Sequence, residues 1–356
     1  MIKNDEKPIQ KYRFFSQLFF LLICIWIGVE FYYFIQFLQS DTLSSNFYRP
    51  AGVEAFLPIS ALMSIYYFIL TGTIHSSHPA GFFILLGVLS VSLVFGKSFC
   101  SWICPIGFIS ELIGDFGEKI ITKTFKRKFF IPKIVDYPLR AIKYLLFGFF
   151  IYVIFFSMTV LSLKMFLDSP YNLVADIKMY VFFANITKFS FIVVFTLFTL
   201  SIFIRGFWCR YLCPYGALLG AFSFFSLTRI RRNKISCINC NLCTKVCSSR
   251  IKVNKVKTVY SDECTMCLNC VDVCPVKDTL VVEDRFTKYP IKKLHIAIGV
   301  LIVYFFVIIT GRITGNWNSN ISAAEYKQYY KTINMLGHPT NTTEINELNK
   351  KAKNNK

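Results

Sequence analysis

The sequence predicts an all-α membrane protein with a small α+β domain inserted before its last transmembrane helix. Of its 356 residues, 54% are hydrophobic, 17% are aromatic and 17% are charged, a balance that does not fit an ordinary soluble domain. Several apolar runs reach the roughly 20 residues that a helix needs to cross a bilayer. Between the last two of these runs lies a polar stretch that contains eight of the 13 cysteines.

Five apolar runs are predicted to span the membrane, at residues 14–38, 80–99, 139–163, 189–208 and 294–310. A sixth run, residues 56–72, is short and has Pro58 near its start, so it is predicted to be re-entrant or interfacial. The predicted domains are a membrane domain over residues 1–230, the inserted domain over 231–290, a fifth transmembrane helix over 291–311 and a polar tail over 312–356. The tail contains two amphipathic stretches, residues 323–336 and 343–352, and its polar composition favours a solvated cap over a docking site.

Lysine and arginine residues alternate between loops in the way that the positive-inside rule describes. Four precede the first predicted span, only Arg49 lies in residues 39–78, and many lie in residues 119–143 and in the inserted domain. This alternation predicts that the N-terminus and the inserted domain are cytoplasmic and that the tail lies outside a bacterial inner membrane. It also explains the net charge of +20 without nucleic acid, because the basic residues are spread over loops beside the membrane.

Eight cysteines form two similar runs. The first run is Cys237, Cys240, Cys243 and Cys247, and the second is Cys264, Cys267, Cys270 and Cys274, followed by Pro275. This spacing is typical of a ferredoxin with two [4Fe-4S] clusters, in which the fourth cysteine of each run binds the other cluster. One cluster is therefore predicted on Cys237, Cys240, Cys243 and Cys274, and the other on Cys264, Cys267, Cys270 and Cys247. Zinc fits this spacing poorly, since zinc sites pair two short spacings of two ligands each. Ser248 follows Cys247 where Pro275 follows Cys274, and this change is expected to alter the reduction potential of a cluster and not to abolish its site.

A second cysteine motif occurs twice, as Cys100-x3-Cys104-Pro105 and Cys209-x3-Cys213-Pro214, each followed by x-Gly. This is an internal repeat. Proline suits the first turn of a helix, so Cys104 and Cys213 are predicted at helix N-termini, where the helix dipole lowers a thiol pKa. Lys97 and Arg205, about one turn earlier, are expected to add positive charge.

Three interpretations of this repeat are open. The four cysteines Cys100, Cys104, Cys209 and Cys213 converge on one metal site that holds iron or an iron-sulfur centre, they act as two redox dithiols, or they only mark structural kinks. The lone Cys24 in the first span is expected to be a small apolar residue without a role.

The sequence resembles the NapH-type membrane ferredoxins in both cysteine patterns, and the segment from Arg49 to Leu62 is most similar to their YccM-like branch. The resemblance covers about residues 12–290. It implies two [4Fe-4S] clusters on the eight cysteines, a part for the other four in electron transfer, and a link to quinol. The fifth span and the tail depart from a plain NapH-type protein, which would have four spans.

His75 and His78 are predicted on the outer side, just before the second span. Oxidation of a quinol releases protons, and histidine titrates in the range that receives them. The pair is therefore a candidate quinol site, against the alternative of ordinary polar residues in a loop. No role is assigned to Arg49, Glu54 or Asp176, and His295 is expected to be an interfacial anchor.

These patterns predict a protein that passes electrons between the quinol pool or a cytoplasmic reductant and a respiratory redox partner. The alternative is a membrane reductase or maturation factor that keeps a partner's metal centre or thiol reduced. Whether the chain is itself part of an enzyme, as a quinol dehydrogenase subunit, stays open.

Overall fold

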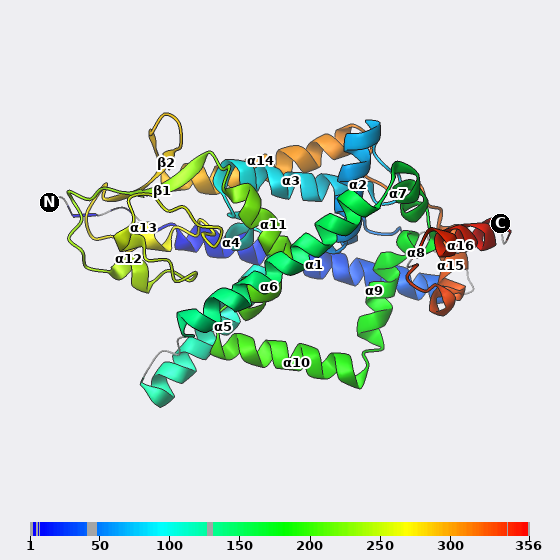
Figure 1. Cartoon of the computed structure of the whole chain (residues 1–356), viewed down its shortest axis with the longest axis horizontal. Coiled ribbons are helices and arrows are strands. Elements are labelled where there is room, and N and C mark those ends of the chain that lie inside the picture. Colours follow the sequence, from blue (N-terminus) through cyan, green and yellow to red (C-terminus); the bar gives the residue numbers. More distant parts are fainter. Residues whose placement is uncertain are drawn as a thin grey trace. The chain divides into compact units, whose positions relative to one another are not determined.

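The structure is a computed structural model that describes residues 3, 4, 6, 8–40, 48–126, 131–339 and 341–354. The chain divides into two compact units, each built from three stretches, whose elements are labelled in Figure 1. The first unit comprises Met1–Leu22, Val88–Phe147 and Ile192–Phe305, and the second comprises Ile23–Gly87, Gly148–Phe191 and Phe306–Lys356. These units cut across the predicted domain boundaries, because the cysteine-rich domain shares a unit with both Cys-x3-Cys-Pro motifs. Arg127 and Lys128 of the basic loop lie outside the described residues.

Three of the predicted spans are helices long and apolar enough to cross a membrane. They are α1 (Gln10–Gln39), the 24-residue stretch Ile134–Ser157 formed by α6 (Lys133–Ile151) and the π-helical η2 (Tyr152–Ser157), and α14 (Lys293–Ile313). The third predicted span therefore ends earlier than expected, since α7 (Val160–Leu167) is a separate helix. Its break lies at Met158, which has an extended backbone conformation.

The other two predicted spans are shorter helices. α3 (Pro79–Phe95) has 17 residues and α10 (Lys188–Phe203) has 16. α10 together with α9 (Ala175–Ala184) is long and apolar enough to be one span, with a bend of 87° between the two helices. The described residues therefore contain three candidate spans, or four if this pair is one. The sixth run forms α2 (Pro58–Thr71), whose 14 residues reach about 21 Å, less than the hydrocarbon thickness of a bilayer.

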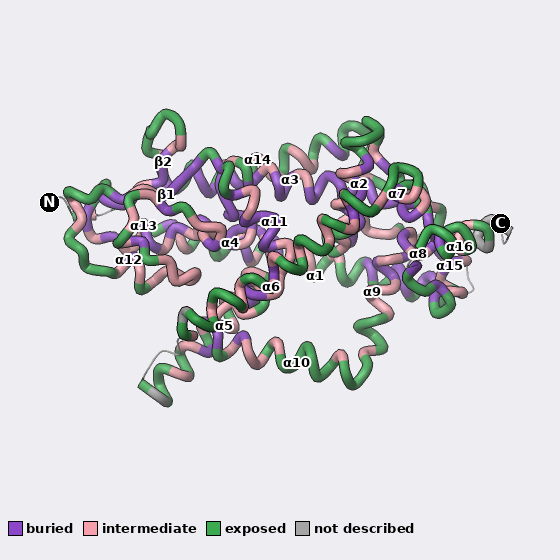
Figure 2. Tube along the Cα trace, viewed as in Figure 1, coloured by how far each residue is buried: buried purple, intermediate pink, exposed green. Residues whose placement is uncertain are grey.

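Many large apolar side chains on these helices are exposed, among them Phe15, Trp26, Phe149, Phe191 and Phe306. Figure 2 shows α10 exposed along most of its length. Exposed apolar surface on this scale would be costly in water, whereas lipid covers it without loss. The composition and the structure thus agree on a membrane protein.

The cysteine-rich part of the first unit is built on an antiparallel sheet. β1 (Thr228–Arg232) pairs with β2 (Leu280–Asp284), which also pairs with β3 (Pro290–Ile291). Between β1 and β2 the chain forms three short helical turns, α12 (Leu242–Lys245), η4 (Val253–Lys255) and α13 (Asn269–Asp272). This part of the first unit thus combines short helices with a small sheet, and the sheet reaches slightly beyond residues 231–290.

The first unit also contains the helical turns around the repeat, namely α4 (Phe99–Trp102), α5 (Pro105–Phe125), η3 (Trp208–Leu212) and α11 (Pro214–Ser223). The second unit holds the remaining elements, η1 (Ala51–Phe56), α8 (Pro170–Leu173), α15 (Ala323–Lys331), η5 (Ile333–Met335) and α16 (Thr342–Asn354).

The tail is part of the core of the second unit. Tyr326, Tyr329 and Ile333 pack in one hydrophobic cluster with Phe34 and Ile177, while Ile345 joins a second cluster. Both amphipathic stretches are helical, as predicted, but their apolar faces are buried. The expectation of a solvated cap is therefore wrong, because the tail supplies apolar side chains that cover α1 and α9.

Candidate metal centres

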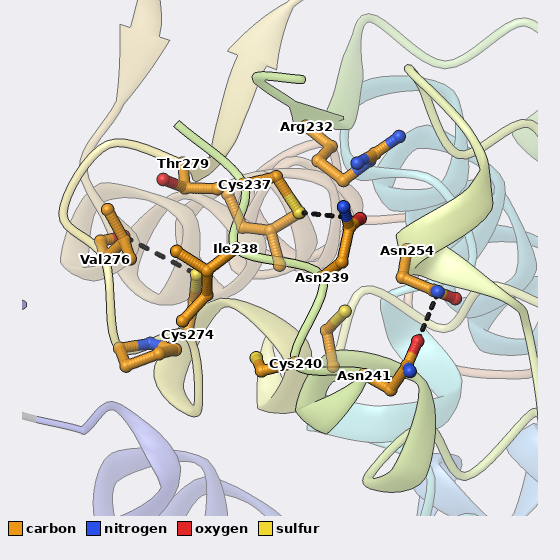
Figure 3. Close-up of a pocket in the computed structure, with 13 residues that line it drawn as sticks. Arg232, Cys237, Ile238, Asn239, Cys240, Asn241, Asn254, Cys274, Val276 and Thr279 are labelled. Carbon is orange, nitrogen blue, oxygen red and sulfur yellow. Dashed lines mark hydrogen bonds between the residues drawn. The ribbon is translucent and has the colours of Figure 1, made fainter. Parts of the chain in front are cut away.

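The first candidate centre is a cavity lined by Cys237, Cys240, Cys243 and Cys274. Figure 3 shows Cys237, Cys240 and Cys274 around it, with Cys274 beside Val276. The thiol of Cys274 lies close enough to the other three for each of their charges to raise its pKa, after burial, which is the larger cause. The fourth cysteine of the second run thus joins the first three of the first run, as the crossover spacing predicts.

The second candidate centre is a cavity lined by Cys247, Cys264, Cys267 and Cys270. Burial raises the pKa of Cys264 to about 12, and the charges of Cys267 and Cys247 act in the same direction. Here the backbone N–H of Ile251 donates to the Cys247 sulfur at 3.4 Å. Four cysteine sulfurs around one cavity are the donor set that a [4Fe-4S] cluster needs, so both cavities fit this group.

The two loops around these cavities share an unusual backbone. Asn239 and Asn241 in the first loop have φ of 55° and 62°, and Met266 and Leu268 at the matching positions in the second have 49° and 63°. Left-handed conformation is uncommon for such residues and is found where a local constraint demands it. The repeated strain shows that both cysteine loops fold to the same plan.

The two centres differ in exposure. Cys240 is exposed, whereas Cys270 and its neighbour Leu268 are buried. Although burial acts to raise it, hydrogen bonding from the Asn239 backbone and the nearby Arg232 hold the pKa of Cys237 below its usual value. The first centre therefore lies near solvent and the second lies inside the unit.

The helix is interrupted twice at each Cys-x3-Cys-Pro motif. The helix before each motif ends near a glycine in left-handed conformation, Gly96 (φ 65°) or Gly206 (φ 69°). A new helix then begins at the proline, with Cys104 or Cys213 as its N-cap. The Cys104 sulfur accepts from the Gly107 N–H at 3.4 Å and the Cys213 sulfur accepts from the Gly216 N–H at 3.3 Å. The prediction that both cysteines sit at helix N-termini is confirmed.

The four cysteines of the repeat lie together. The charges of the other three all act on the pKa of Cys104, and those of Cys213 and Cys100 act on the pKa of Cys209. All four belong to the first unit. The motifs therefore converge on one place, as a shared site requires.

The expected lowering of the thiol pKa at the helix N-termini is wrong for Cys104, and the pKa values of Cys100 and Cys209 are raised as well. Burial is the largest cause, and it raises the pKa of Cys100 to about 11, that of Cys209 to about 12, and that of Cys104 well above its usual value. The Gly107 N–H at Cys104 acts in the predicted direction but is outweighed. Thiols in such surroundings are poor at disulfide exchange, because exchange needs the thiolate.

One of the two expected basic residues reaches the repeat. Lys97 is 3% exposed, and although burial acts to lower it, the charges on Cys100, Glu263 and Cys213 hold its pKa above the usual value. Arg205 points elsewhere and pairs with Asp115 at 2.7 Å and Glu111 at 3.5 Å. The prediction holds for Lys97 and is wrong for Arg205.

The cysteine-rich loop docks directly on the first Cys-x3-Cys-Pro motif. The Ser101 hydroxyl donates to the Thr265 carbonyl at 2.5 Å, and the Trp102 indole N–H donates to the Met266 carbonyl at 3.1 Å. Ser101 and Trp102 lie inside the first motif, and Thr265 and Met266 lie between Cys264 and Cys267. Hydrogen bonds thus join the backbone of the second centre to the repeat.

A buried ion pair fixes the same loop to α6. Lys143 is fully buried and its ammonium donates to the Glu263 carboxylate, while the Tyr144 hydroxyl donates to Asp262. Arg140 approaches both acids at 3.3 Å. Sequence reasoning missed this network because the positive-inside pattern already accounted for Arg140 and Lys143, and no local signal marks their partners.

The candidate quinol histidines are both buried in the second unit. His78 uses both ring nitrogens, with Nε2 2.7 Å from the Asn172 carbonyl oxygen and Nδ1 3.3 Å from Arg49 Nη2. Arg49 in turn pairs with Glu54 and Asp176, each at 2.6 Å. His75 has its Nε2 3.1 Å from Asp168, whose side chain is 50% exposed. Sequence reasoning noticed Arg49, Glu54 and Asp176 but missed that they form one cluster around His78.

No three His, Cys, Asp or Glu side chains among the described residues are placed to hold a single metal ion. A [4Fe-4S] cluster spreads its ligands around a larger body than one ion does, so the cysteine groups are compatible with clusters. His295 is exposed at the start of α14, and Cys24 lies in α1, apart from the motifs.

Two family models match the chain on these cysteines. A 4Fe-4S binding domain matches residues 77–124 and again 187–233, which places one copy over each Cys-x3-Cys-Pro motif. A 4Fe-4S dicluster domain matches residues 229–275, which include all eight cysteines of the double run. With the apolar helices, the fold and sites define a membrane iron-sulfur protein of electron transport.

The chain belongs to the YccM-like family of membrane ferredoxins, which is related to NapH. It is 39% identical over 342 residues to the electron transport protein YccM of Escherichia coli (strain K12), an alignment that covers 94% of each chain. It is 29% identical to the ferredoxin-type protein NapH of Haemophilus influenzae, over 53% of this chain and 63% of the relative. Similarity to the regulatory protein NosR of Pseudomonas aeruginosa, at 27% identity, covers 56% of this chain and 27% of the relative. No solved structure matches the chain significantly.

Proposed function

We propose that this chain carries single electrons between a soluble surface and the membrane, using three iron-sulfur sites in its first unit. The observation that supports this most is the docking of the loop between Cys264 and Cys267 on Ser101 and Trp102. Two metals with purely structural roles would not need this contact. Electron transfer does need it, because the two sites must lie close together.

Two of the three sites are the cavities of the double run, with Cys237, Cys240, Cys243 and Cys274 holding one cluster and Cys264, Cys267, Cys270 and Cys247 the other. The third is the group of Cys100, Cys104, Cys209 and Cys213, for which we also propose a [4Fe-4S] cluster. When bound, such clusters store and release one electron at a time. The protein contributes burial, N–H donors to sulfur and nearby charge, which set the potential.

The exposed end of the first unit is the proposed docking place of a soluble redox partner. Cys240 is exposed there, and Ile235 and Ile238 beside Cys237 are 94% and 47% exposed. Apolar side chains around a solvent-facing centre suit a transient redox contact, which is small in area. By the positive-inside rule we place this end and the N-terminus in the cytoplasm and the tail outside a bacterial inner membrane.

Quinol is the proposed membrane substrate, with electrons drawn from it or from a cytoplasmic reductant and delivered to a respiratory partner. Of the two histidines, His75 is the better proton acceptor, because its partner Asp168 reaches solvent, whereas His78 is enclosed by Arg49 and Asn172. The proton balance of quinol oxidation requires such an exit, since each quinol gives up two protons with its two electrons.

Iron content tests the number of sites. Protein purified anaerobically in detergent is expected to contain about twelve irons and as much acid-labile sulfide, four per cluster. The Cys104→Ser variant should fall to about eight, while Cys24→Ser, a matched change outside the motifs, should keep the full content. Colourless protein without labile sulfide would refute the proposal, and eight irons in both the parent and Cys104→Ser would remove the third site.

Electron donors test the quinol link. A reduced quinone analogue should reduce the clusters, as followed by electron paramagnetic resonance, and the His75→Gln variant should slow this step more than Tyr48→Phe does. If the quinol analogue fails while a partner metal ion or disulfide accepts electrons from the pre-reduced protein, the chain is a maturation reductase instead.

A further inference from the structure

Lys97 is a buried lysine whose position is not explained by the positive-inside pattern of the loops. It lies between α3 and α4, where the helix has broken at Gly96, and its side chain crosses from the first copy of the repeat to the second. Its Nζ lies 3.5 Å from the point where a Cβ on Gly216 would stand. Gly216 is the residue whose N–H donates to the Cys213 sulfur at 3.3 Å, so the ammonium reaches the sulfur ligands of the opposite motif.

The ammonium of Lys97 has no carboxylate partner among the described residues. The ion pairs of the first unit take up Arg13, Arg140, Lys143, Arg205, Arg210, Arg231 and Lys293, and none includes Lys97. The residue is nevertheless only 3% exposed. A buried ammonium without a counter-anion is strongly unfavourable, so the fold must supply negative charge in another form.

The charge of Glu263 also acts on Lys97, but that carboxylate is already paired with Lys143 and Arg140. The cysteine sulfurs are therefore the negative groups left to balance the ammonium. A cluster held by four thiolates carries net negative charge, and one added electron makes it more negative. We infer that Lys97 is the positioning residue that balances this charge at the site of Cys100, Cys104, Cys209 and Cys213 and thereby raises its reduction potential. This inference rests on the proposed third iron-sulfur site.

The second copy of the repeat provides an internal control. Arg205 also lies about one turn before its cysteine, four residues ahead of Cys209 where Lys97 is three ahead of Cys100, but its guanidinium is held by Asp115 and Glu111. A charge already paired with acids acts weakly on a distant centre, because the opposite charges cancel. The repeat therefore has one basic residue directed at the sulfurs and one directed away.

Redox titration monitored by electron paramagnetic resonance tests the inference on the full-length protein in detergent. Lys97→Met removes the charge but keeps a long apolar side chain, Lys97→Arg keeps the charge, and Arg205→Gln is the matched control. In Lys97→Met the equilibrium constant for one-electron reduction of one centre should fall at least tenfold, which equals 59 mV. Lys97→Arg and Arg205→Gln should change it less than threefold, and the other two centres should keep their potentials.

Iron content separates failure of the inference from failure of the third site. Twelve irons with an unchanged potential in Lys97→Met would overturn the role of Lys97 and leave the site intact. If Lys97→Met drops to eight irons while Lys97→Arg keeps twelve, the charge is needed for binding and the inference stands. If both variants drop to eight irons, the shape of the lysine side chain matters and not its charge, and the inference fails. Eight irons in the parent protein would overturn the inference together with the third site.

Discussion

The cluster around Arg49 in the second unit and Lys97 in the first unit bury charge in opposite ways. In the second unit, Arg49 lies between Glu54 and Asp176, the other Glu54 oxygen accepts from the Gly81 N–H at 2.8 Å, and the other Asp176 oxygen accepts from Ile177 at 2.9 Å. Every member of that cluster has its partners. In the first unit, Lys97 lies near Cys100, Cys209 and Cys213 and forms no ion pair with an acid among the described residues.

The contrast separates structural charge from charge that serves a ligand. A closed network in which every donor and acceptor is used has nothing left to offer a substrate, and breaking it leaves an uncompensated ion. An ammonium that has no acid partner and lies beside sulfur ligands is stabilised only when an anionic group is bound there. Mutations at the two sites should therefore differ in kind, with loss of folding at the Arg49 cluster and loss of redox properties at Lys97.

Arg49→Met should have the largest effect. It leaves Glu54 and Asp176 buried without a cation, and the free energy of unfolding of the second unit should fall by about 3–5 kcal/mol. Thermal unfolding in detergent, followed by protease accessibility of the tail, measures the loss. Arg312→Met, at an exposed residue of the same unit beside Trp317, should cost less than about 1 kcal/mol. Equal losses in both variants would contradict a special role for the closed cluster.

Glu263→Gln should come next, because it leaves Lys143 buried without its main partner. We expect a loss of about 3 kcal/mol, seen as faster release of iron to a chelator from the centre of Cys264. The double variant Lys143→Met/Glu263→Leu should recover most of the loss, since apolar side chains of similar size replace a buried ion pair well. No recovery would mean that the carboxylate acts on the loop by itself.

Gly107→Ala should have a smaller effect on stability but a selective effect on the third site. A Cβ at this position would stand 2.2 Å from the Cys100 carbonyl oxygen, so the turn that positions Cys104 must shift, at a cost of about 1–3 kcal/mol. Iron should fall toward eight per chain while the double-run centres persist. Gly148→Ala, where no atom lies within 4 Å, should leave the iron unchanged.

The pH dependence of the stability of the second unit should be the smallest of these effects near neutral pH. Burial acts to raise the pKa of Glu54, but Arg49 and His78 together hold it below its usual value. A carboxyl whose pKa is lowered by folding stabilises the fold above its unfolded pKa, and this stability is lost as the pH falls through the folded pKa. The unfolding temperature should therefore be flat from about pH 7 to pH 5 and fall below about 4.5, and Glu54→Gln should flatten that acid limb.

The cysteine spacing predicted which cysteines lie around each of the two cavities, because ligand spacing is a local property of the sequence. Three cysteines in one short loop and a fourth from the other run leave few ways to surround a cluster, and the cavities group Cys247 and Cys274 as that logic requires. The break at each Cys-Pro was predictable for the same reason, since proline restricts the residue before it and begins the helix after it. Span lengths were less predictable, because Gly96 and Gly206 end the helices before the apolar runs end.

Sequence alone predicted which cysteines group around each cavity and that the chain is a membrane protein, because spacing and apolar length depend only on neighbours along the chain. The tertiary structure decided which charges face each other: Lys97 toward the cysteines and Arg205 away, Lys143 against Glu263, and Arg49 between Glu54 and Asp176. It also placed residues of the tail in the hydrophobic core of the second unit. It buried the thiols of Cys100, Cys104 and Cys209, which raises their pKa. Burial and long-range pairing arise only when distant segments pack, so no local pattern in the sequence contains them.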